Sequence, residues 1–521
     1  EKETPFYVLV AVVLVCIVLA IFMDSFLVPV FFMISIGMAI VYNLGSNYFL
    51  GEVSYITKAL AAVLQLGVTL DYSIFLWHSY KEAKEETPDN HHEAMAVAIG
   101  NTLTSVVGSS ITTVAGFIAL CFMSFTLGLD LGVVMAKGVV LGVIGCVTIL
   151  PSLILTFDKA LEKTMHREIM PNFDKPARWI VNHSWIFLII FVLLLGPAIY
   201  GYNNTKVYYD LSDTLPEKLN CSQANKMLAD NFDGTNSIYM ILADSNLSAE
   251  DSNAMMNEVN DLVGISFALS IDSALGGEIP TEMLPDSLVS ELKGDEYQIM
   301  MVSTNYTIAS DEINDQINKV DAIAKKYDAK SMVIGEAPLM KDLEDVTNVD
   351  LVNVNALSIA AIFIIIMIIF KSISLPIILV AVIEFAIMVN MAIPFYQGTS
   401  LPFVASIVIG AIQLGATVDY AILMTTRYQK ERQRGRDKME AISIAHKTSM
   451  PSIISSGLSF FAATFGVACY SQVEMIGSIC TLLARGAIIS MVVVILILPA
   501  MFMIFDKVIC KTSIGFLGGK K

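Results

Sequence analysis

Long apolar runs, separated by short polar connections, constrain this chain more than any other feature of its sequence. Eleven runs approach the length of about 20 residues that a bilayer-spanning helix needs: 6–23, 28–42, 55–79, 104–122, 131–157, 185–200, 351–370, 375–393, 403–426, 453–470 and 475–505. In lipid, every backbone polar group needs a partner within the protein, so these runs predict helices rather than open strands. The sequence therefore predicts a polytopic α-helical membrane protein with about 11 transmembrane helices.

One segment between the runs differs sharply from the rest in charge. The chain is 55% apolar and only 16% charged, against about 25% charged residues in soluble domains, which excludes an ordinary cytosolic enzyme and a disordered chain. Residues 203–350 hold 27 Asp and Glu against 9 Lys and Arg, a net charge of −18, whereas the remainder carries a net charge of +1. Neither part carries the excess of basic residues that would attract nucleic acid, so nucleic acid is not an expected partner.

The basic residues predict the orientation of the chain. Connections on one side of the predicted membrane carry 19 Lys and Arg: 81–93, 157–184, 371, 427–447 and 506–521. The short connections on the other side carry none: 43–54, 123–130, 394–400 and 471–474. Since basic residues mark the cytoplasmic side, we expect a cell-membrane protein whose acidic 203–350 segment lies outside the cytoplasm.

These features divide the chain into six predicted parts. They are a first repeat of five helices (1–157), a cytoplasmic linker (158–184), a single helix (185–202), an extracytoplasmic domain (203–350), a second repeat of five helices (351–506) and a cytoplasmic tail (507–521). Within the extracytoplasmic domain, strand-like runs at 237–242, 296–304 and 331–334 alternate with helical patterns at 248–263 and 311–327. That order predicts an α+β domain, a small sheet layered with helices.

An internal repeat relates the two sets of five helices. Gln65-Leu-Gly-Val-Thr-Leu-Asp-Tyr72 matches Gln413-Leu-Gly-Ala-Thr-Val-Asp-Tyr420 at an offset of 348. The same offset aligns Tyr80 with Tyr428, Lys137 with Arg485, Pro151 with Pro499 and Asp158 with Asp506. The halves are therefore predicted to be parallel duplicates. Because only the second copy is preceded by a helix and an outer domain, we expect a further helix and a second outer domain ahead of Glu1 in the native chain.

Two aspartates inside apolar runs are the sharpest chemical signal. Asp71 and Asp419 each lie nine residues before a tyrosine at the cytoplasmic end of the run, about 13 Å deep at 1.5 Å per residue. A charged residue at such a depth costs about 2.5–3.5 kcal/mol or more, and it usually marks a proton or ion path. Removal from water favours the neutral carboxyl form, which suits a group that loads and releases protons. The alternative is a structural polar contact between helices, which the duplication makes less attractive.

Neighbouring residues suggest how the aspartates are supported. Tyr72 and Tyr420 follow them directly and point about 100° away on the helix, so Asp71 can pair with Tyr420 and Asp419 with Tyr72 if the duplicated helices abut. Gly67 and Gly415, four residues earlier, would permit close helix approach. Hydroxyl residues early in the next run of each half could hydrogen-bond the carboxylates, hold water or simply pack helices: Ser109, Ser110, Thr112, Thr113, Ser455, Ser456 and Ser459.

Three further charged residues lie within the predicted spans. Glu384 has a depth similar to the aspartates, but its counterpart in the first half is Ile36, so it either tunes one half or faces a polar cavity. Lys137 and Arg485 lie nearer the outer surface and are expected to reach the outer headgroups. No zinc-type cysteine pair, P-loop, HExxH or Gly-x-Ser-x-Gly pattern occurs. We therefore expect no bound metal, no cofactor and no enzymatic activity.

The repeated motifs Gly67-x-x-x-Asp71-Tyr72 and Gly415-x-x-x-Asp419-Tyr420, the duplicated five-helix sets and the outer domain resemble the resistance–nodulation–division superfamily. The resemblance is to its mycobacterial-membrane-protein-large (MMPL) branch of lipid and hydrophobic-compound exporters. It implies twelve helices, two extracytoplasmic porter domains and Asp–Tyr pairs that relay protons. Asp71 and Asp419 would then carry protons, with Tyr72 and Tyr420 as their partners. The lack of a first helix and a first porter domain departs from that pattern.

The resemblance implies an exporter driven by the proton motive force, with membrane lipids and a hydrophobic or lipidic substrate as its partners. Sodium stays open as the coupling ion because carboxylates and hydroxyls also suit a hard cation, and a homo-oligomer stays open too. One alternative is a protein-export accessory of the same superfamily, which is not expected to carry the Asp–Tyr pair in both halves. The other is a non-pumping lipid- or sterol-sensing protein, which should be indifferent to a collapsed proton gradient.

Overall fold

The computed structural model describes residues 4–87, 90–166, 170–171, 173–209, 219–231, 237–274 and 292–517. The chain divides into a helical unit, residues 1–207 with 349–521, and an extracytoplasmic unit, residues 208–348. The second unit is slightly shorter than the predicted 203–350 because the helix before it continues to Asn204.

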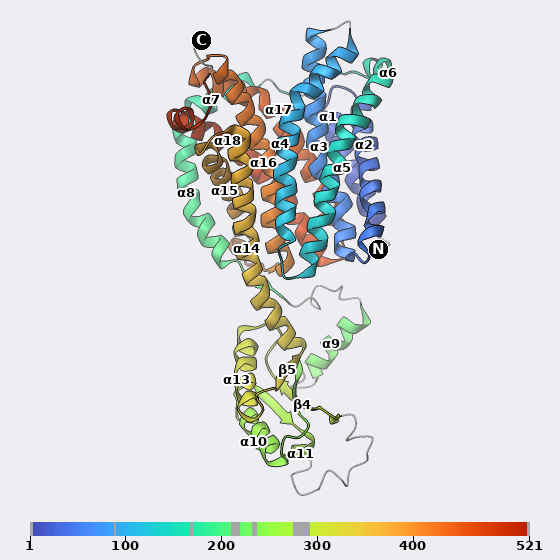
Figure 1. Ribbon diagram of the computed structural model, residues 1–521, viewed down its shortest axis with the longest axis vertical. Helices are drawn as coiled ribbons and strands as arrows, with labels where there is room; N and C mark the ends of the chain where they lie inside the picture. Colours follow the sequence, from blue (N-terminus) through green and yellow to red (C-terminus); the bar gives the residue numbers. More distant parts are fainter. Residues whose placement is uncertain are drawn as a thin grey trace. The chain divides into compact units, whose positions relative to one another are not determined.

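The helical unit contains the two predicted sets (Figure 1). The first set is α1 (Thr4–Phe22), α2 (Leu27–Ser46), α3 (Tyr55–Glu86), α4 (His91–Leu120) and α5 (Thr126–Thr156). The second is α14 (Glu336–Phe370), α15 (Ser374–Gln397), α16 (Phe403–Gln433), α17 (Lys438–Tyr470) and α18 (Glu474–Thr512). The other elements are η1 (Asn47–Leu50), α6 (Asp158–Lys163), α7 (Asp174–Asn182), α8 (Ser184–Asn204), β1 (Val207–Tyr208) and β6 (Leu401–Pro402).

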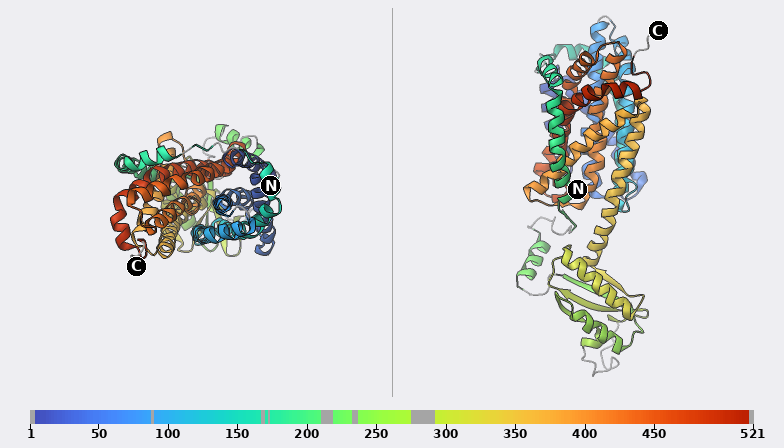
Figure 2. Two further views of the ribbon diagram at one scale, coloured as in Figure 1. Left: turned by 90° about the horizontal axis from the view of Figure 1, so that it is seen from above. Right: turned by 90° about the vertical axis from the view of Figure 1, so that its left-hand side faces the viewer.

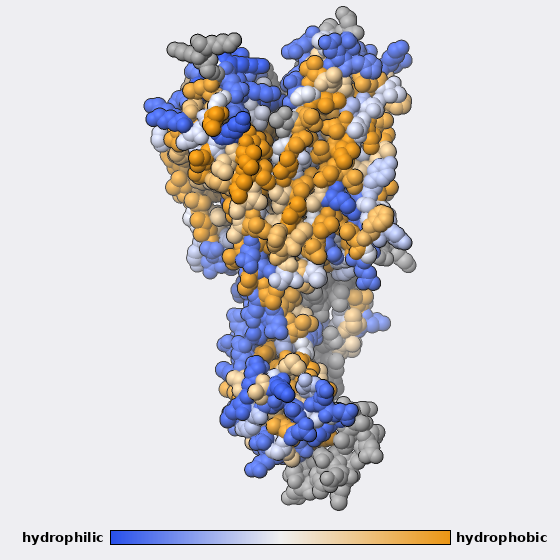
Figure 3. Space-filling view, in the orientation of Figure 1, coloured by the Kyte–Doolittle hydropathy of each residue, from blue (hydrophilic) through white to orange (hydrophobic). Residues whose placement is uncertain are grey.

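Ten helices in the described residues are long and apolar enough to cross a membrane. The bent helix α4, whose axis turns by 41° between Leu103 and Ser105, is an eleventh when it is counted as one span. The predicted number of transmembrane helices is therefore confirmed. Figure 3 shows apolar side chains over the flank of this unit and hydrophilic ones at the end that carries α6 and α7.

Side-chain caps fix where several of these helices begin. The Ser54 hydroxyl accepts a hydrogen bond from Ile56 N at the start of α3, and Asn90 and Asp437 cap α4 and α17 in the same way. Such caps pair backbone N–H groups that the first turn of a helix leaves free. The cap at Ser54 thereby fixes the start of α3, the helix that carries Asp71, whereas α16, which carries Asp419, begins after Pro402 without a side-chain cap.

The first helix of each set packs on the other set, so the two halves interlock. Helix α1 packs along α17, where a side chain at Gly466 would meet Leu14 and Val10. In the other half, Ile369 of α14 lies beside Gly108 of α4, nearer the cytoplasmic ends of these helices. Figure 2 (left) shows the two sets side by side when the helices are viewed end-on. This exchange agrees with the predicted duplication of the halves.

The extracytoplasmic unit is an α+β domain, as predicted. Its elements are α9 (Asn220–Asn231), β2 (Ser237–Asp244), α10 (Ala249–Asn260), β3 (Ile265–Leu269), α11 (Ile271–Ala274), β4 (Tyr297–Thr304), α13 (Asp311–Tyr327) and β5 (Met332–Gly335). The strands form an antiparallel sheet in the order β3-β4-β2-β5. This β-α-β-β-α-β arrangement is of the split βαβ, ferredoxin-like type.

One hydrophobic core holds the extracytoplasmic unit together. Alternate residues of β2 and β4, such as Tyr239, Ile241 and Val302, face the buried sides of α10 and α13. Figure 2 (right) shows these helices packed on the sheet. The period-two burial of the strands matches the period-3.6 burial of the helices, which is why this pairing forms a single core.

Candidate functional site

The aspartates occupy the centre of the helical unit. Every residue in the apolar window of α3 is buried, and nearly all of that of α16 is as well, so these two helices are surrounded by others. The side chains of Asp71 and Asp419 are only 2% and 1% exposed, and Tyr72 and Tyr420 are fully buried. A carboxylate so enclosed requires polar neighbours or a changeable charge.

The two halves contribute to each other's aspartates. The Coulomb interaction of Tyr72 with Asp419 exceeds its interaction with Asp71 on its own helix, and Tyr420 interacts more strongly with Asp71 than with Asp419. Because the Coulomb energy falls with distance, each tyrosine faces the aspartate of the other half. The four residues thus lie in a crossed arrangement, but no hydrogen bond joins a tyrosine to an aspartate among the described residues, where both tyrosine hydroxyls are without a partner, so the pairing stays a prediction.

Hydroxyl groups of the neighbouring helices complete the cluster. Ser456 of α17 faces Asp71, and Ser109 and Thr113 of α4 face Asp419. Thr113 also donates a hydrogen bond of 3.0 Å from Oγ1 to the carbonyl oxygen of Gly415, which joins α4 to α16. The helix that follows each aspartate-bearing helix in one half therefore serves the aspartate of the other half.

Many polar atoms of this cluster have no protein hydrogen-bond partner within the described residues. They are Oδ1 of Asp71, both carboxylate oxygens of Asp419, and the hydroxyls of Tyr72, Tyr420, Ser109 and Ser456. The hydroxyls of Ser455 and Ser459, on the same helix as Ser456, also have no partner, but no contact places them against an aspartate. Buried polar atoms are almost always paired in native proteins, and an unpaired one costs about 1–3 kcal/mol. This concentration of buried polar atoms makes the cluster the candidate functional site.

Two of the predicted hydroxyls are engaged elsewhere. Ser110 Oγ donates to Val107 O at 3.0 Å, and Thr112 Oγ1 donates to Ser109 O at 2.6 Å, both within α4. Glu384 lies in a separate cavity with Tyr202, Asn355 and Ser406. The cluster thus gathers the aspartates, the tyrosines, Ser109, Thr113 and Ser456.

The expectation that the two aspartate helices abut needs correction. Helix α3 packs mainly on α4, α5 and α17, and α16 packs mainly on α4, α17 and α18. A Cβ atom at Gly67 would lie 2.2 Å from Cδ2 of Phe460 on α17, and one at Gly415 would lie 3.4 Å from Thr113 O on α4. The glycines do permit close approach, but to the following helix of the other half. The interface between the halves is therefore made by α3 with α17 and α16 with α4, together with the contacts of α1 with α17 and of α14 with α4 described above.

A buried amide network beside each aspartate was not predicted. Asn43 Nδ2 donates to Gln65 Oε1 at 2.8 Å, and Gln65 Nε2 donates to Gly138 O at 3.0 Å. The second half repeats it, since Asn390 Nδ2 donates to Gln413 Oε1 at 2.8 Å. These bonds tie α2, α3 and α5 together, and likewise α15, α16 and α18. Gln65 and Gln413, six residues before each aspartate inside the repeat, were the available signal.

The outer lysine and arginine bind protein oxygens rather than headgroups, which corrects the expectation for both. Arg485 Nε donates to Asn390 Oδ1 at 2.7 Å and its guanidinium also reaches Asn390 O. Lys137 Nζ donates to Asn47 Oδ1 at 2.6 Å, at the outer end of α2. In each case an asparagine side chain close to the basic group supplies a carbonyl oxygen, so the lysine or arginine does not have to extend to a lipid headgroup.

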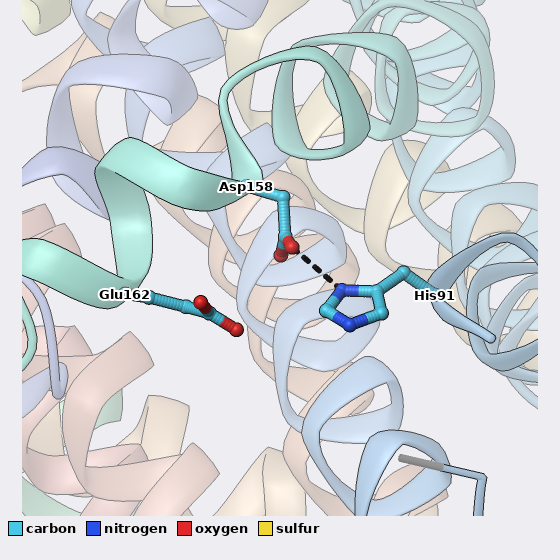
Figure 4. A group of neighbouring side chains, drawn as sticks. All are labelled: His91, Asp158 and Glu162. Carbon is cyan, nitrogen blue, oxygen red and sulfur yellow. Dashed lines mark ion pairs between the residues drawn. The ribbon is translucent and has the colours of Figure 1, made fainter. Parts of the chain in front are cut away.

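A second duplicated contact closes the cytoplasmic end of each half. Tyr80 OH donates to Asp158 Oδ1 at 3.4 Å, and Tyr428 OH donates to Asp506 at the equivalent place. In the first half, His91 Nδ1 also lies 2.6 Å from Asp158 Oδ2, with Glu162 beside the pair (Figure 4). The ligand atoms of His91, Asp158 and Glu162 lie within 4.8 Å of one another, a spacing that a metal ion could use. However, Lys84 Nζ already lies 3.1 Å from Glu162 and 3.4 Å from Asp158, so the cluster holds its own cation.

The fold and the site define a class: a polytopic membrane protein of two duplicated, interlocked helical sets with a buried carboxylate cluster between them and an extracytoplasmic α+β unit. Within this class, the chain belongs to the MMPL family, whose family model matches residues 1–185 and 217–511.

Three relatives illustrate the similarity. The membrane protein YdfJ of Bacillus subtilis is 22% identical over 86% of this chain and 63% of its own length. The putative membrane protein ActII-3 of Streptomyces coelicolor is 22% identical over 93% of this chain and 68% of its own length. The mycolic acid-containing lipids exporter MmpL11 of Mycolicibacterium smegmatis is 23% identical over 35% of this chain and 19% of its own length. The chain thus spans about two thirds of the length of the first two relatives.

Proposed function

We propose that this protein exports lipids or other amphiphilic compounds and is driven by protons that pass through the Asp71–Tyr420 and Asp419–Tyr72 pairs. The observation that carries the proposal is the crossed cluster of buried, unpaired oxygen atoms at the interface of the two halves. Membership of the MMPL family supports a transporter, and the similarity to an exporter of mycolic acid-containing lipids supports a lipidic substrate.

The chemistry of coupling follows from charge. A deprotonated Asp71 or Asp419 favours an arrangement in which hydroxyls turn toward it, since the low local dielectric strengthens each such interaction. Protonation removes the charge and thereby that preference. Because Tyr72 and Tyr420 come from the opposite half, a change in either aspartate alters the fit between the halves.

The remaining contacts determine where movement is easiest. Within each half, the Asn–Gln network and the cytoplasmic Tyr–Asp pair are satisfied hydrogen bonds that hold the helices as one body. Between the halves, Thr113 Oγ1 donates to Gly415 O, while most other polar groups of the cluster are unpaired among the described residues. In this mechanism, protonation shifts one half against the other along α3/α17 and α16/α4, and the motion reaches the extracytoplasmic unit through α8 and α14, which lead directly into it along the chain.

The test is proton-coupled movement by the full-length protein in liposomes. A pH gradient is imposed and the movement of a fluorescent phospholipid is followed for wild type, Asp71→Asn and Asp419→Asn. We expect both variants to fall to the background rate, because asparagine cannot exchange a proton. Tyr72→Phe and Tyr420→Phe, which remove only a hydroxyl, should reduce the rate without abolishing binding of the lipid.

The matched control is Asp130→Asn, the same chemical change at a carboxylate outside the cluster. Asp130 Oδ2 accepts a hydrogen bond from Ser54 N at 3.0 Å, and an asparagine oxygen can still accept it. Wild-type rates for Asp71→Asn and Asp419→Asn would refute the relay. Movement of the phospholipid that follows a sodium gradient instead would show that sodium, not the proton, is the coupling ion. Lipid binding without any dependence on a gradient would favour a lipid-sensing protein.

A further inference from the structure

A small cavity with its own carboxylate lies in the second half of the helical unit. It has a volume of about 190 Å³ and is bounded by α8, α14, α15 and α16. Its polar lining is Tyr202, Asn355, Glu384 and Ser406, and Gly410 and Leu414 complete the wall on α16. None of these groups belongs to the Asp–Tyr cluster.

The cavity extends from the extracytoplasmic side toward the depth of Asp419. Tyr202 lies two residues before the outer end of α8, and Ser406 lies three residues after the outer start of α16. Glu384 lies ten residues from the cytoplasmic start of α15, about 15 Å along the helix. Leu414, at the inner wall, precedes Asp419 by five residues, or about 8 Å of helical rise. The lining therefore leads from the outer surface to the level of the relay.

The size of the cavity selects its occupant. Pockets for small organic ligands have volumes of about 300–1,000 Å³, so this one is too small for an amphiphile. A water molecule takes up about 30 Å³ and needs two to four polar partners, which means that about six water molecules would fit. The carboxylate of Glu384, the amide of Asn355 and the hydroxyl of Tyr202 supply such partners, and Asn355 Nδ2 lies 3.4 Å from Tyr202 OH.

Glu384 has no counter-charge in this cavity. No lysine, arginine or histidine is among the lining residues, and Glu384 takes part in none of the ion pairs between described residues. Among the described residues that line the cavity, Tyr202 is the only other titratable group. Arg485 of α18, which also packs on α15, binds Asn390 instead. An uncompensated carboxyl group at such a depth is costly and points to a role with protons or cations.

The position is also asymmetric. The equivalent amide bonds of Asn43 and Asn390 align α2 with α15 at an offset of 347, so the residue of the first half that corresponds to Glu384 is Gly37 rather than Ile36. The two aspartates are duplicated, whereas this carboxyl group is not, so it serves only the half that carries Asp419.

We propose that this cavity is the extracytoplasmic proton intake of the transporter, in which Glu384 collects protons from outer water and delivers them toward Asp419. The Glu384 carboxylate takes a proton from a hydronium ion and leaves water. The neutral carboxyl group then returns that proton to a water molecule on the inner side, and from there the proton moves around α16 to the Asp419 carboxylate, which does not itself line the cavity. This assignment rests on the proposed proton relay and names the side and the group through which the relay is loaded.

The test measures proton uptake from each side separately. Full-length protein is reconstituted in one orientation in liposomes that contain a pH-sensitive dye, and a pH jump is applied from either face. For Glu384→Gln we expect uptake from the extracytoplasmic face to slow by about 100-fold at neutral outer pH, the lower end of the range for removal of a proton-transferring group. Uptake should recover as the outer pH is lowered, and uptake from the cytoplasmic face should be unchanged.

Two further variants separate chemistry from structure. Glu384→Asp keeps a carboxyl group and should retain most of the outer uptake. Gly410→Ala changes no charge, but its Cβ would lie 2.6 Å from Asn355 Oδ1, so it should narrow the cavity and slow outer uptake selectively. Equal slowing from both faces in Glu384→Gln, with Glu384→Asp no better, would mean a structural role and would overturn the assignment.

The failure of this inference is distinguishable from failure of the relay itself. If Asp419→Asn stops uptake while Glu384→Gln behaves as wild type, the intake is wrong and the relay stands. If Asp419→Asn takes up protons normally, the relay is wrong as well. If uptake of sodium rather than protons depends on Glu384, the proton assignment is overturned.

Discussion

The two interface glycines are equivalent in sequence but not in surroundings, which leads to a sharp prediction about alanine at each. At Gly67, a Cβ would lie 2.2 Å from Cδ2 and 2.7 Å from Cε2 of Phe460, a ring that is only 2% exposed. Carbon atoms in contact prefer about 3.5–4.0 Å, so the ring would have to move by about 1.3 Å within a packed interface. At Gly415 the nearest atoms, Thr113 O and Cα, lie at 3.4 and 3.5 Å, which is ordinary contact.

The expected energies follow from these distances. Overpacking of a buried site costs about 1–3 kcal/mol, whereas alanine in place of glycine within a helix gains up to about 1 kcal/mol. Gly67→Ala should therefore be destabilising by up to about 2 kcal/mol, and Gly415→Ala should be neutral or slightly stabilising. Gly67→Ala should also slow transport because it props α3 away from α17.

The assay is thermal unfolding of the purified protein in detergent, combined with gradient-driven transport in liposomes. Gly37→Ala on α2 is the matched control, since a Cβ there would meet no atom within 4 Å, and it isolates the helix-propensity gain. Equal effects of Gly67→Ala and Gly415→Ala, or a larger effect at Gly415, would refute the assignment of close contact to α3 and α17.

Two other predictions test different parts of the molecule. Gln65→Leu and Gln413→Leu should each lower the free energy of unfolding by about 0.6–1.7 kcal/mol, the range for interhelical hydrogen bonds in membranes, because each breaks its amide network. Gln433→Leu, at the cytoplasmic end of α16, is the control. An unchanged melting temperature in both buried variants would show that the amide networks do not stabilise the helices. In the extracytoplasmic unit, bonds from Asn246 hold the pKa of Asp244 below its usual range, and Lys326 and Tyr327 do the same for the pKa of Glu258. A carboxyl group whose pKa is lower in the folded than in the unfolded state stabilises the fold above about pH 4, and that stability is lost as the pH falls further. Hydrogen-exchange protection of α10 and α13 should therefore decline below about pH 4, and less steeply in Glu258→Gln. Protection that does not change with pH would show that the contacts of Asp244 and Glu258 do not stabilise this unit.

The sequence predicted the helical unit well because its signal is thermodynamic and local. A single run of apolar residues in lipid can pair all its backbone groups only as an α-helix, so the spans were predicted without knowledge of their neighbours. The main error in length was α14, which was expected from 351 and begins at Glu336. Its first turns lie outside the apolar run, where the hydropathy of the sequence carries no information about helix continuation. In the extracytoplasmic unit, β3 was missed because only five residues form it, beside an already paired strand.

The candidate site was predictable where the repeat made it visible and not where contacts decided it. Asp71 and Asp419 stood out because a carboxylate in an apolar run is rare and here occurs twice. Asn43 and Asn390 could not be recognised from the sequence, because they align at an offset of 347 rather than 348 and each looks like an ordinary polar residue near the end of a helix. Their partners Gln65 and Gln413 become meaningful only when α2 and α15 are placed beside them.

If the proposed relay operates, the distribution of satisfied and unsatisfied hydrogen bonds explains how the crossed arrangement couples protonation to movement of the halves. If Tyr72 served Asp71 and Tyr420 served Asp419, each half would contain its own complete pair, and protonation would leave the fit between the halves unaffected. With the tyrosines, Ser456 and Thr113 all supplied across the interface, a change of charge on either aspartate acts on groups that belong to the other body. The amide networks and the Tyr–Asp pairs resist deformation inside each half, so the response is confined to the interface. A double variant that disrupts both amide networks should therefore uncouple proton flux from lipid movement, with protons still passing while transport falls, whereas a proportional loss of both would show that the networks serve stability alone.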